Sequence, residues 1–370
     1  MVPKLSLRLL TVIVLWNCAA TAEAPPLAAG QAKSPAWSLD TRQKEMIVSV
    51  SPARQTLQIA GTTGILLGAG ISAISNAKHR KAVEEILNGY DAGSIFQEHV
   101  ETRLQETFGP ALERVDPPDP PIRHEDRRAY ARDRLRAISH QGHDILLDLE
   151  MTYGLFGFEG TLVAKLVGVL RDLAQGEALW EKTLVVSSED ILASDRLTDP
   201  TKRMMPNMRS PRLTVEEGAI EQWTSDGGVI LKQRMNEAIE GVVAALVTDL
   251  GLAQDPKGHY YLGRLVMNRK NFEEAHQLYQ EALKLAPDMT AAKNGMSVNL
   301  AHNGQLDEAI ALAQELTKSA PEYGPAWYNL AWWHAVERND LAAAGPYYEK
   351  ALALGMPPEK DIEKKLKAKE

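Results

Sequence analysis

Apolar residues in the last third of the chain recur at the spacing of helices, and the helices come in pairs separated by short polar breaks. Leu262, Leu265 and Val266 lie on one helical face, at i, i+3 and i+4. After a polar break, a second face is formed by Phe272, Ala275, Leu278, Tyr279 and Ala282. The same order of face, break and face occurs twice more, with breaks at 302–304 and 337–339. The pattern predicts three helix–turn–helix pairs.

The three pairs follow one another at a period of 34 residues, beginning at Pro256, Thr290 and Gly324. The third pair needs one extra residue, which we place in its turn, near 338–340. Small side chains at positions 8 and 20 of each pair allow two helices to approach closely, and apolar or small side chains recur at positions 24 and 27. Position 8 holds Gly263, Ser297 and Ala331, and position 20 holds Ala275, Ala309 and Ala344. Position 24 holds Tyr279, Ala313 and Tyr348, and position 27 holds Ala282, Leu316 and Ala351.

This period and these positions resemble the tetratricopeptide repeat, whose unit is a pair of antiparallel helices. Trp327 stands where the family has a tryptophan, whereas His259 and Lys293 stand there in the other two copies. The resemblance implies an all-α solenoid of three repeats over 256–356, whose inner groove, formed by the first helix of each pair, binds another protein. Since no single pair can bury both of its faces, about three copies are needed for stability. A charged helix within 357–370 is expected to cap the array.

The pattern of apolar and polar residues over 45–250, the middle of the chain, predicts an α/β domain with a mixed sheet flanked by helices. Apolar and polar residues alternate over 145–153, which indicates a strand with one buried face. Residues 162–170 are almost wholly apolar and predict a central strand. A third strand is expected at 178–186, after a hairpin turn at 174–177.

Three further stretches of this domain bear on its shape. Residues 46–50 are expected to form its first strand. Residues 57–74, rich in glycine and apolar side chains, favour a helix packed closely on the sheet; a membrane-contacting segment is the alternative, which its length and polar residues oppose. Asp226 is placed to cap a long helix that covers the sheet and leads into the repeats. The apolar face of that helix comprises Leu231, Met235, Ala238, Val242, Leu246 and Leu250.

Residues 1–22 have the pattern of a secretory signal, because two positive residues precede a short apolar run that ends in small side chains. Cys18 lies at the end of that run, as the lipidated cysteine of a bacterial lipoprotein does; cleavage after Ala22, which would remove it, is the alternative. Residues 23–44 are expected to be a flexible linker. The sequence thus predicts an exported protein on the periplasmic side of the cell envelope, either an outer-membrane lipoprotein or a soluble periplasmic protein.

The net charge and the polar residues limit which partners, metal sites and catalytic residues the sequence supports. A net charge of −8 disfavours nucleic acid as a partner. His140 and His143 have the spacing of metal ligands, but they precede a strand and no second cluster accompanies them. Ser139, Ser187 and Ser188 belong to no nucleophile motif. The sequence therefore predicts no catalytic residue, no metal and no cofactor.

In the repeat family, side chains at positions 5, 9 and 13 of each first helix face the groove, so the resemblance implies partner contacts there. These positions hold Tyr260, Arg264 and Asn268; Asn294, Val298 and His302; and Tyr328, Trp332 and Val336. All except the two valines are predicted to bind the partner. Tyrosine, tryptophan and arginine are frequent binding anchors, and Arg264 suits an acidic segment. The alternative is that Tyr260 and Trp332 pack on neighbouring repeats or on the α/β domain.

Taken together, these patterns predict a non-enzymatic, membrane-anchored envelope scaffold that binds another envelope protein or peptide through its repeats. Two alternatives stay open. The run from Leu170 to Trp180 resembles a strand–turn–strand of curli-secretion and TolB-amino-terminal envelope lipoproteins, which suggests a component of curli-type secretion or outer-membrane assembly. A hydrolytic enzyme with its site in the α/β domain is the other, and a perturbed, buried Asp or His in a cleft would favour it.

Overall fold

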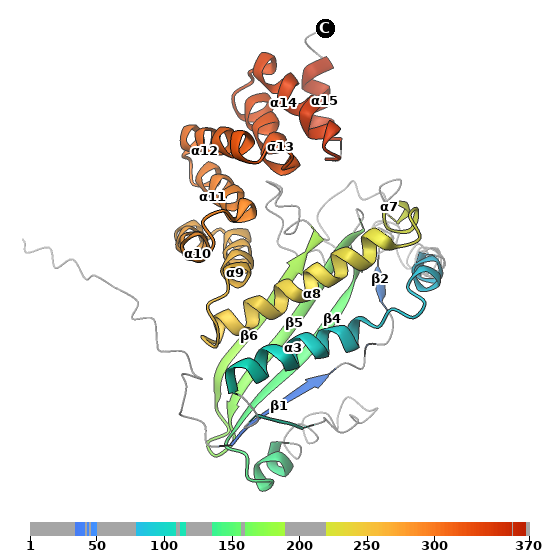
Figure 1. The fold of residues 1–370 in the computed structure, drawn as a ribbon, viewed down its shortest axis with the longest axis vertical. Helices are drawn as coiled ribbons and strands as arrows, with labels where there is room; N and C mark the ends of the chain where they lie inside the picture. Colours follow the sequence, from blue (N-terminus) through green and yellow to red (C-terminus); the bar gives the residue numbers. More distant parts are fainter. Residues whose placement is uncertain are drawn as a thin grey trace, which may run out of the picture.

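The computed structural model consists of a sheet covered by helices and an array of helices that follows it (Figure 1). This confirms the predicted α/β domain followed by an all-α repeat array. The predicted signal, Cys18 and the glycine-rich stretch 57–74 lie outside the residues that the structure describes. The described residues are 34–40, 43, 46–49, 79–108, 112–115, 135–156, 160–188, 220–356 and 358–367.

One mixed sheet forms the core of the first unit. Its strands are β1 (Pro35–Asp40), β2 (Ile47–Ser49), β3 (Glu113–Arg114), β4 (Ile145–Phe156), β5 (Thr161–Asp172) and β6 (Ala178–Ser187). They lie in the order β3-β1-β4-β5-β6, and β2 pairs with β4 beyond the end of β1. The strands β4, β5 and β6 are antiparallel neighbours, whereas β1 and β2 run parallel to β4. A strand therefore lies on each side of β5, as its apolar composition predicted.

The strand β1 corrects two predictions at the start of the domain. Residues 35–40 fall in the range assigned to a flexible linker, yet they pair with the first half of β4 and are almost fully buried. The domain therefore begins at Pro35 rather than at 45, and the strand predicted at 46–50 is the second one. Six residues after a segment rich in proline and alanine hold too little alternation to indicate a strand.

The side chain of Gln43 bridges the gap between β1 and β2. Its Nε2 donates to the carbonyl oxygen of Tyr153 at 2.6 Å, and its Oε1 accepts from the N–H of Tyr153 at 3.1 Å. The side-chain amide thus takes the place of the peptide group that a continuous strand would supply. As a result, the backbone of β4 stays hydrogen-bonded at a residue that neither parallel strand reaches.

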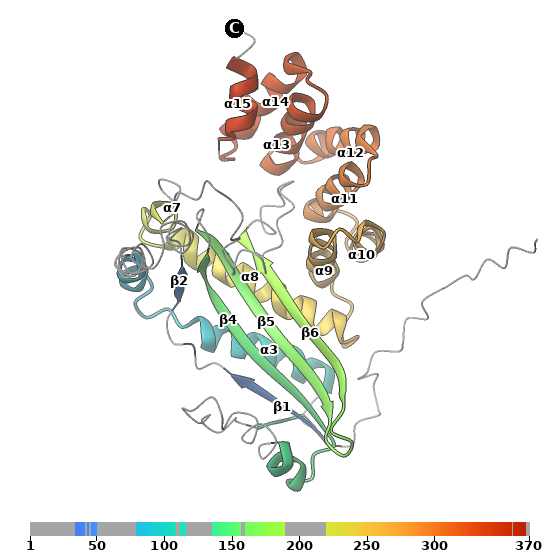
Figure 2. The ribbon, with the colours of Figure 1, turned by 180° about the vertical axis from the view of Figure 1, so that it is seen from behind.

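Two long helices, α3 (Ala92–Phe108) and α8 (Val229–Asp249), lie on the same face of the sheet, and the strands lie in front of them when the molecule is seen from behind (Figures 1 and 2). A short helix, α7 (Glu221–Thr224), precedes α8. Alternation along β4 places Leu147, Leu149 and Met151 in the core beneath these helices. From α3 the core receives Phe96, Val100 and Leu104.

The helix α8 is amphipathic in its first half and buried on all sides in its second. The apolar face predicted for this helix, from Leu231 to Leu250, is buried throughout. The N-cap residue is Gly228 and not Asp226 as predicted, but the Asp226 carboxylate still accepts from the N–H of Ile230 in the first turn, at 2.8 Å. Every residue over 241–248 is also buried, because the next helix packs on the part of α8 that the sheet leaves uncovered. Although α8 has 21 residues, no helix in the described part of the chain is long and apolar enough to cross a membrane.

The helix α9 (Pro256–Asn268) is joined to α8 by close backbone approach and to α3 by an ion pair. A Cβ added at Gly258 would lie 2.0 Å from Oγ1 of Thr248 and 2.5 Å from the carbonyl oxygen of Ala244. Asp255 caps α9 by accepting from the N–H of Gly258 at 3.2 Å, and its carboxylate also pairs with Arg103 of α3. The first repeat is therefore held to the sheet unit by both of the helices that cover the sheet.

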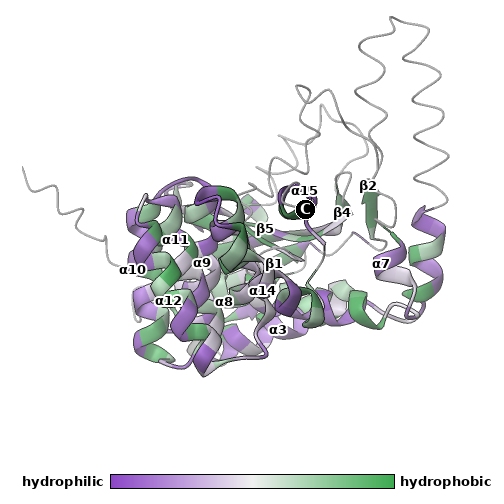
Figure 3. Ribbon diagram, turned by 90° about the horizontal axis from the view of Figure 1, so that it is seen from above, coloured by the Kyte–Doolittle hydropathy of each residue, from purple (hydrophilic) through white to green (hydrophobic). Residues whose placement is uncertain are grey.

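The repeats continue as antiparallel pairs of amphipathic helices, each carrying hydrophilic and hydrophobic sides (Figure 3). After α9 come α10 (Phe272–Leu285), α11 (Thr290–His302), α12 (Leu306–Ser319), α13 (Gly324–Trp332), the π-helical turn η3 (Trp333–Glu337), α14 (Leu341–Ala353) and α15 (Lys360–Lys367). All the residues at recurrent positions 8, 20, 24 and 27 are buried. The ring of Tyr279 fills the space over two glycines, since a Cβ at Gly263 or Gly295 would lie 2.7 or 2.8 Å from its Cε1.

The extra residue of the third copy lies in its first helix, and not in the turn where we predicted it. The turns of the three copies are alike, because each has its middle residue in the left-handed region, with φ of 65° at Lys270, 83° at Gly304 and 54° at Asn339. The extra residue is absorbed by η3, which continues α13. A single residue inserted into an α-helix typically forms such a turn, and such turns are frequent at functional sites.

We expect Gly258→Val to lower the free energy of unfolding by about 1–3 kcal/mol, because its side chain would enter space held by Thr248 and the backbone of α8. Gly345→Ala is the matched control, since Gly345 also lies within a helix but an added Cβ would meet no atom within 4 Å beyond its chain neighbours and the backbone of its own helix. Because Pro346 follows Gly345 and its ring opposes a Cβ on the preceding helical residue, we expect no stabilisation and a change of less than about 1 kcal/mol. Thermal or urea unfolding measures both changes. A Gly258→Val chain as stable as the wild type would contradict the close packing of α8 on α9.

Candidate functional site

The residues predicted to contact a partner separate into two groups by their burial. Four are buried and three are partly exposed. The buried residues are Tyr260, Arg264, Asn294 and Tyr328, and the partly exposed ones are Asn268, His302 and Trp332. The predicted surface is therefore not one continuous line of accessible side chains.

Tyr260 and Arg264 belong to the interior of the array. The Tyr260 ring packs against the rings of Tyr261 and Tyr279, with centroids 5.0 and 6.2 Å apart. Arg264 is 1% exposed, so its guanidinium is not offered to an acidic partner. Burial raises the pKa of Tyr323 well above its ordinary value, an effect to which Tyr260 adds and which the Arg264 charge opposes. Tyr323, which directly precedes the third copy, thus lies close to Tyr260 and Arg264 of the first copy.

A buried amide pair joins the second copy to the third. Nδ2 of Asn329 donates to Oδ1 of Asn294 at 3.1 Å, and neither side chain is accessible. A hydrogen bond between two buried polar side chains favours the one arrangement of helices that satisfies it. Asn294 therefore sets the register of α11 against α13 instead of facing a ligand.

A pocket of about 450 Å³ lies between the second and third copies and brings together three of the predicted residues, His302, Tyr328 and Trp332. Tyr328 and Trp332 come from α13, while η3 supplies Trp333 and Glu337. The remaining wall, from α11, the following turn and the start of α12, consists of Ala301, His302, Gly304 and Leu306. Four aromatic residues, His302, Tyr328, Trp332 and Trp333, and one carboxylate thus line the junction of two repeats.

Two of the pocket side chains are held in place by neighbours outside it. The hydroxyl of Tyr328 donates to Oε2 of Glu359 at 2.9 Å. The ring of His302 stacks on that of Phe272, with centroids 6.2 Å apart and planes 7° from parallel. Because these side chains are already oriented, a ligand would lose little affinity in ordering them.

Trp333 and Glu337 were missed by the sequence analysis. Both lie in η3, whereas we predicted that the extra residue of the third copy lies in the turn that follows. The sequence does contain a sign of these residues, because the 34-residue period of the repeats is broken by one residue in the third copy. An insertion within a helix moves side chains onto a face that they would not otherwise occupy.

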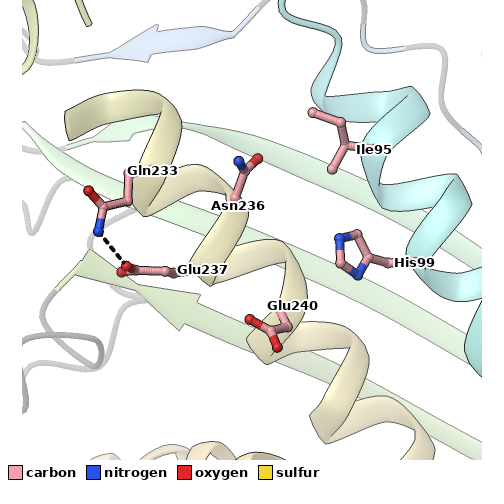
Figure 4. A pocket seen from close by; sticks show the side chains of 6 residues that line it. All are labelled: Ile95, His99, Gln233, Asn236, Glu237 and Glu240. Atoms are coloured by element: carbon pink, nitrogen blue, oxygen red, sulfur yellow. Dashed lines mark hydrogen bonds between the residues drawn. The ribbon is translucent and has the colours of Figure 1, made fainter. Parts of the chain in front are cut away.

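A second hollow, of about 540 Å³, lies between α3 and α8 (Figure 4). Its lining residues are Ile95, His99, Gln233, Asn236, Glu237 and Glu240. Gln233 donates to Glu237 at 3.0 Å, Lys257 donates to Glu240 at 2.6 Å, and Tyr90 donates to Asn236 at 2.7 Å, so four of the five polar residues there already have partners. Ile95 is the single apolar residue among the six. This composition is typical of a solvated furrow between helices and not of a pocket for an organic ligand.

The described part of the α/β domain does not present the perturbed, buried group that would favour a hydrolase. Hydrogen bonds from Ser94 lower the pKa of Asp91, which caps the start of α3 and is exposed. His143 lies 3.3 Å from Oγ of Ser34 and 3.8 Å from a carboxylate oxygen of Glu113. Among the described residues no three His, Cys, Asp or Glu side chains are grouped as a metal ion requires. The hydrolase alternative stays a hypothesis.

Comparison with protein families identifies the repeats. Models of the tetratricopeptide repeat match residues 267–331 and 236–292. No curated protein and no solved structure matches the chain. The chain therefore contains a tetratricopeptide-repeat segment, and because one match begins inside α8, that helix resembles a member of the array as well as a cover for the sheet. The matches give no support to the resemblance to curli-secretion lipoproteins.

We expect His259 to make the chain less stable as the pH falls below about 6.5. Burial lowers the pKa of His259 from its ordinary value of 6.5, and its Nε2 lies 3.2 Å from Oε1 of Gln254. The unfolded chain therefore takes up the proton first, so the stabilisation is complete above about pH 6.5 and is lost as the pH falls toward the folded pKa. Urea unfolding at about pH 7.5 and about pH 5.5 should show a smaller loss for His259→Gln than for the wild type. Equal losses would contradict the assignment.

Proposed function

We propose that this chain is an exported scaffold of the bacterial cell envelope, anchored near the outer membrane, whose repeats bind a segment of another envelope protein. The tetratricopeptide repeats make its C-terminal part a scaffold for protein–protein interaction. The observation that carries the proposal is the pocket between the second and third copies. It joins three predicted partner contacts, His302, Tyr328 and Trp332, of which the first two lie within the segment that the repeat family matches.

The envelope location is supported by the pattern of the N-terminal sequence. Residues 1–22 have the charge, apolar run and small residues of a secretory signal, and Cys18 lies at the end of the apolar run. An exported scaffold with one lipid anchor would hold its repeats close to a membrane surface while leaving them open to proteins in the periplasm.

For the binding site, we expect the double variant His302→Ala and Trp332→Ala to weaken capture of the partner from crosslinked envelopes about tenfold. An anchor aromatic removed from a pocket typically costs about 1–2 kcal/mol of binding. Glu315→Ala is the matched control, because Glu315 is an exposed residue of α12 that does not line the pocket.

Circular dichroism on the same proteins separates lost binding from lost folding. If the double variant unfolds, His302→Ala alone gives the comparison, since His302 is only partly buried. Normal capture by a folded variant would mean that the partner binds elsewhere on the chain.

For the anchor, we expect the wild-type chain to fractionate with outer membranes and to have an intact mass that includes lipid on an N-terminal Cys18. Cys18→Ala should lose both properties. Intact-mass measurement of a mature chain that begins at Glu23 would show that Cys18 is removed with the signal, and the proposed anchor would then be wrong.

A further inference from the structure

One buried side chain of η3 lacks the hydrogen bonds that usually hold such a group. His334 is 7% exposed, and neither of its ring nitrogens has a hydrogen-bond partner in the part of the chain that the structure describes. Buried polar atoms without a partner are uncommon because they are costly, so each one calls for a physical reason. At the same place, position 11 of the repeat, the first two copies have the apolar residues Val266 and Leu300. Packing alone therefore does not explain a histidine here.

A carboxylate lies just beyond hydrogen-bonding distance of this ring. Nδ1 of His334 is 3.6 Å from Oδ2 of Asp340. The other oxygen of that carboxylate, Oδ1, caps α14 by accepting from the N–H of Ala343 at 3.1 Å. The N–H of Asp340 donates to the carbonyl oxygen of His334 at 2.7 Å. A small movement of the ring would convert the contact into a hydrogen bond, and protonation of the imidazole would make that bond a charge-assisted one.

Among the described residues, Asp340 is the acidic residue within 4 Å of the His334 nitrogens. The turn η3 packs chiefly against α13, α14 and α15, and α13 contains no charged residue. On α14 the ring of Tyr347 lies 5.5 Å from that of His334, while Glu349 is exposed and Lys350 is held in an ion pair. The charge that protonation places on the ring would therefore be answered by Asp340.

The charged side chains of α15 and of η3 itself are engaged elsewhere. On α15, Lys365 and Glu363 have hydrogen-bond partners of their own, and the other charged residues of that helix are exposed. Glu337, within η3, is also exposed, and Arg338 pairs with Asp307. None of these groups is recorded against the imidazole in the described part of the chain.

We infer that His334 and Asp340 form a proton-dependent latch between η3 and the start of α14. In the protonated form Nδ1–H of His334 donates to the carboxylate, so that two hydrogen bonds join the turn to α14. In the neutral form the separation is the 3.6 Å of the structure, and the backbone bond acts alone. Because η3 also supplies Trp333 and Glu337 to the pocket, the latch would make that wall more rigid at acidic pH. The inference goes beyond the proposed function, since it concerns the chain without a partner.

Native-state hydrogen exchange of the purified chain tests the latch at the backbone amide of residue 340, which is bonded to the His334 carbonyl. Histidine side chains change charge between about pH 5 and 8, so protection factors are compared at about pH 7.5 and about pH 5.5. They are taken relative to those of α12, which corrects for any change in the stability of the whole array. We expect the relative protection at residue 340 to rise at least about threefold at the lower pH in the wild type, and to stay constant in His334→Gln.

Two further variants complete the test. Asp340→Asn removes the charge but keeps the helix cap, because asparagine is as good an N-cap residue as aspartate, and it should also lose the rise. His276→Gln is the matched control, since His276 lies on α10 beside Gln280, in the first copy, and this variant should keep the rise. A wild type without the rise, or a rise that persists in either His334→Gln or Asp340→Asn, would overturn the inference. The proposed function is judged separately, by capture of the partner with the pocket variants.

Discussion

The packing of one helix, α8, against two different structures holds this molecule together. One side of α8 covers the sheet, and its last turn is tied to β6, since Trp180 and Lys182 both donate to the carboxylate of Asp249, at 2.7 and 2.6 Å. The other side receives α9 so closely that position 258 has no room for a Cβ. Each valine or leucine side chain buried in this way contributes about 1.5–3 kcal/mol, so pulling the two units apart would expose several such side chains over 241–248.

This shared helix determines where the repeats can bind. The first copy packs against α8 and against neighbouring copies of the array, which is why Tyr260 and Arg264 are buried. The pocket lies farther along, where η3 adds Trp333 and the exposed Glu337 to residues of the second copy and of α13. The pocket that results is a property of the junction between two repeats. A firm connection at one end of the array and an oriented pocket toward the other suit a scaffold that presents its ligand at a set position relative to the sheet unit.

Regular periods along the chain predicted most of the fold, and features without a period were missed. The 34-residue repeat and the face of α8 from Leu231 to Leu250 recur often enough to be read in one sequence. The strand β1 has six residues and pairs with β4 more than a hundred residues away, so no local pattern marks it. The extra residue of the third copy could sit in a turn or in a helix with the same spacing. Arg264 occupies a groove position of the family, and only packing against neighbouring copies reveals that it is buried.

The central claim is that α8 makes the sheet and the repeats one cooperative unit, and native-state hydrogen exchange of the purified chain tests it most directly. Backbone amides over 242–248 in α8, those over 259–265 in α9 and those of β5 should all exchange through openings of similar free energy, because opening any one of them exposes the same buried interface. Slow exchange in α8 and β5 together with openings of much lower free energy in α9 would contradict the account, and would mean that the repeats unfold as a separate module.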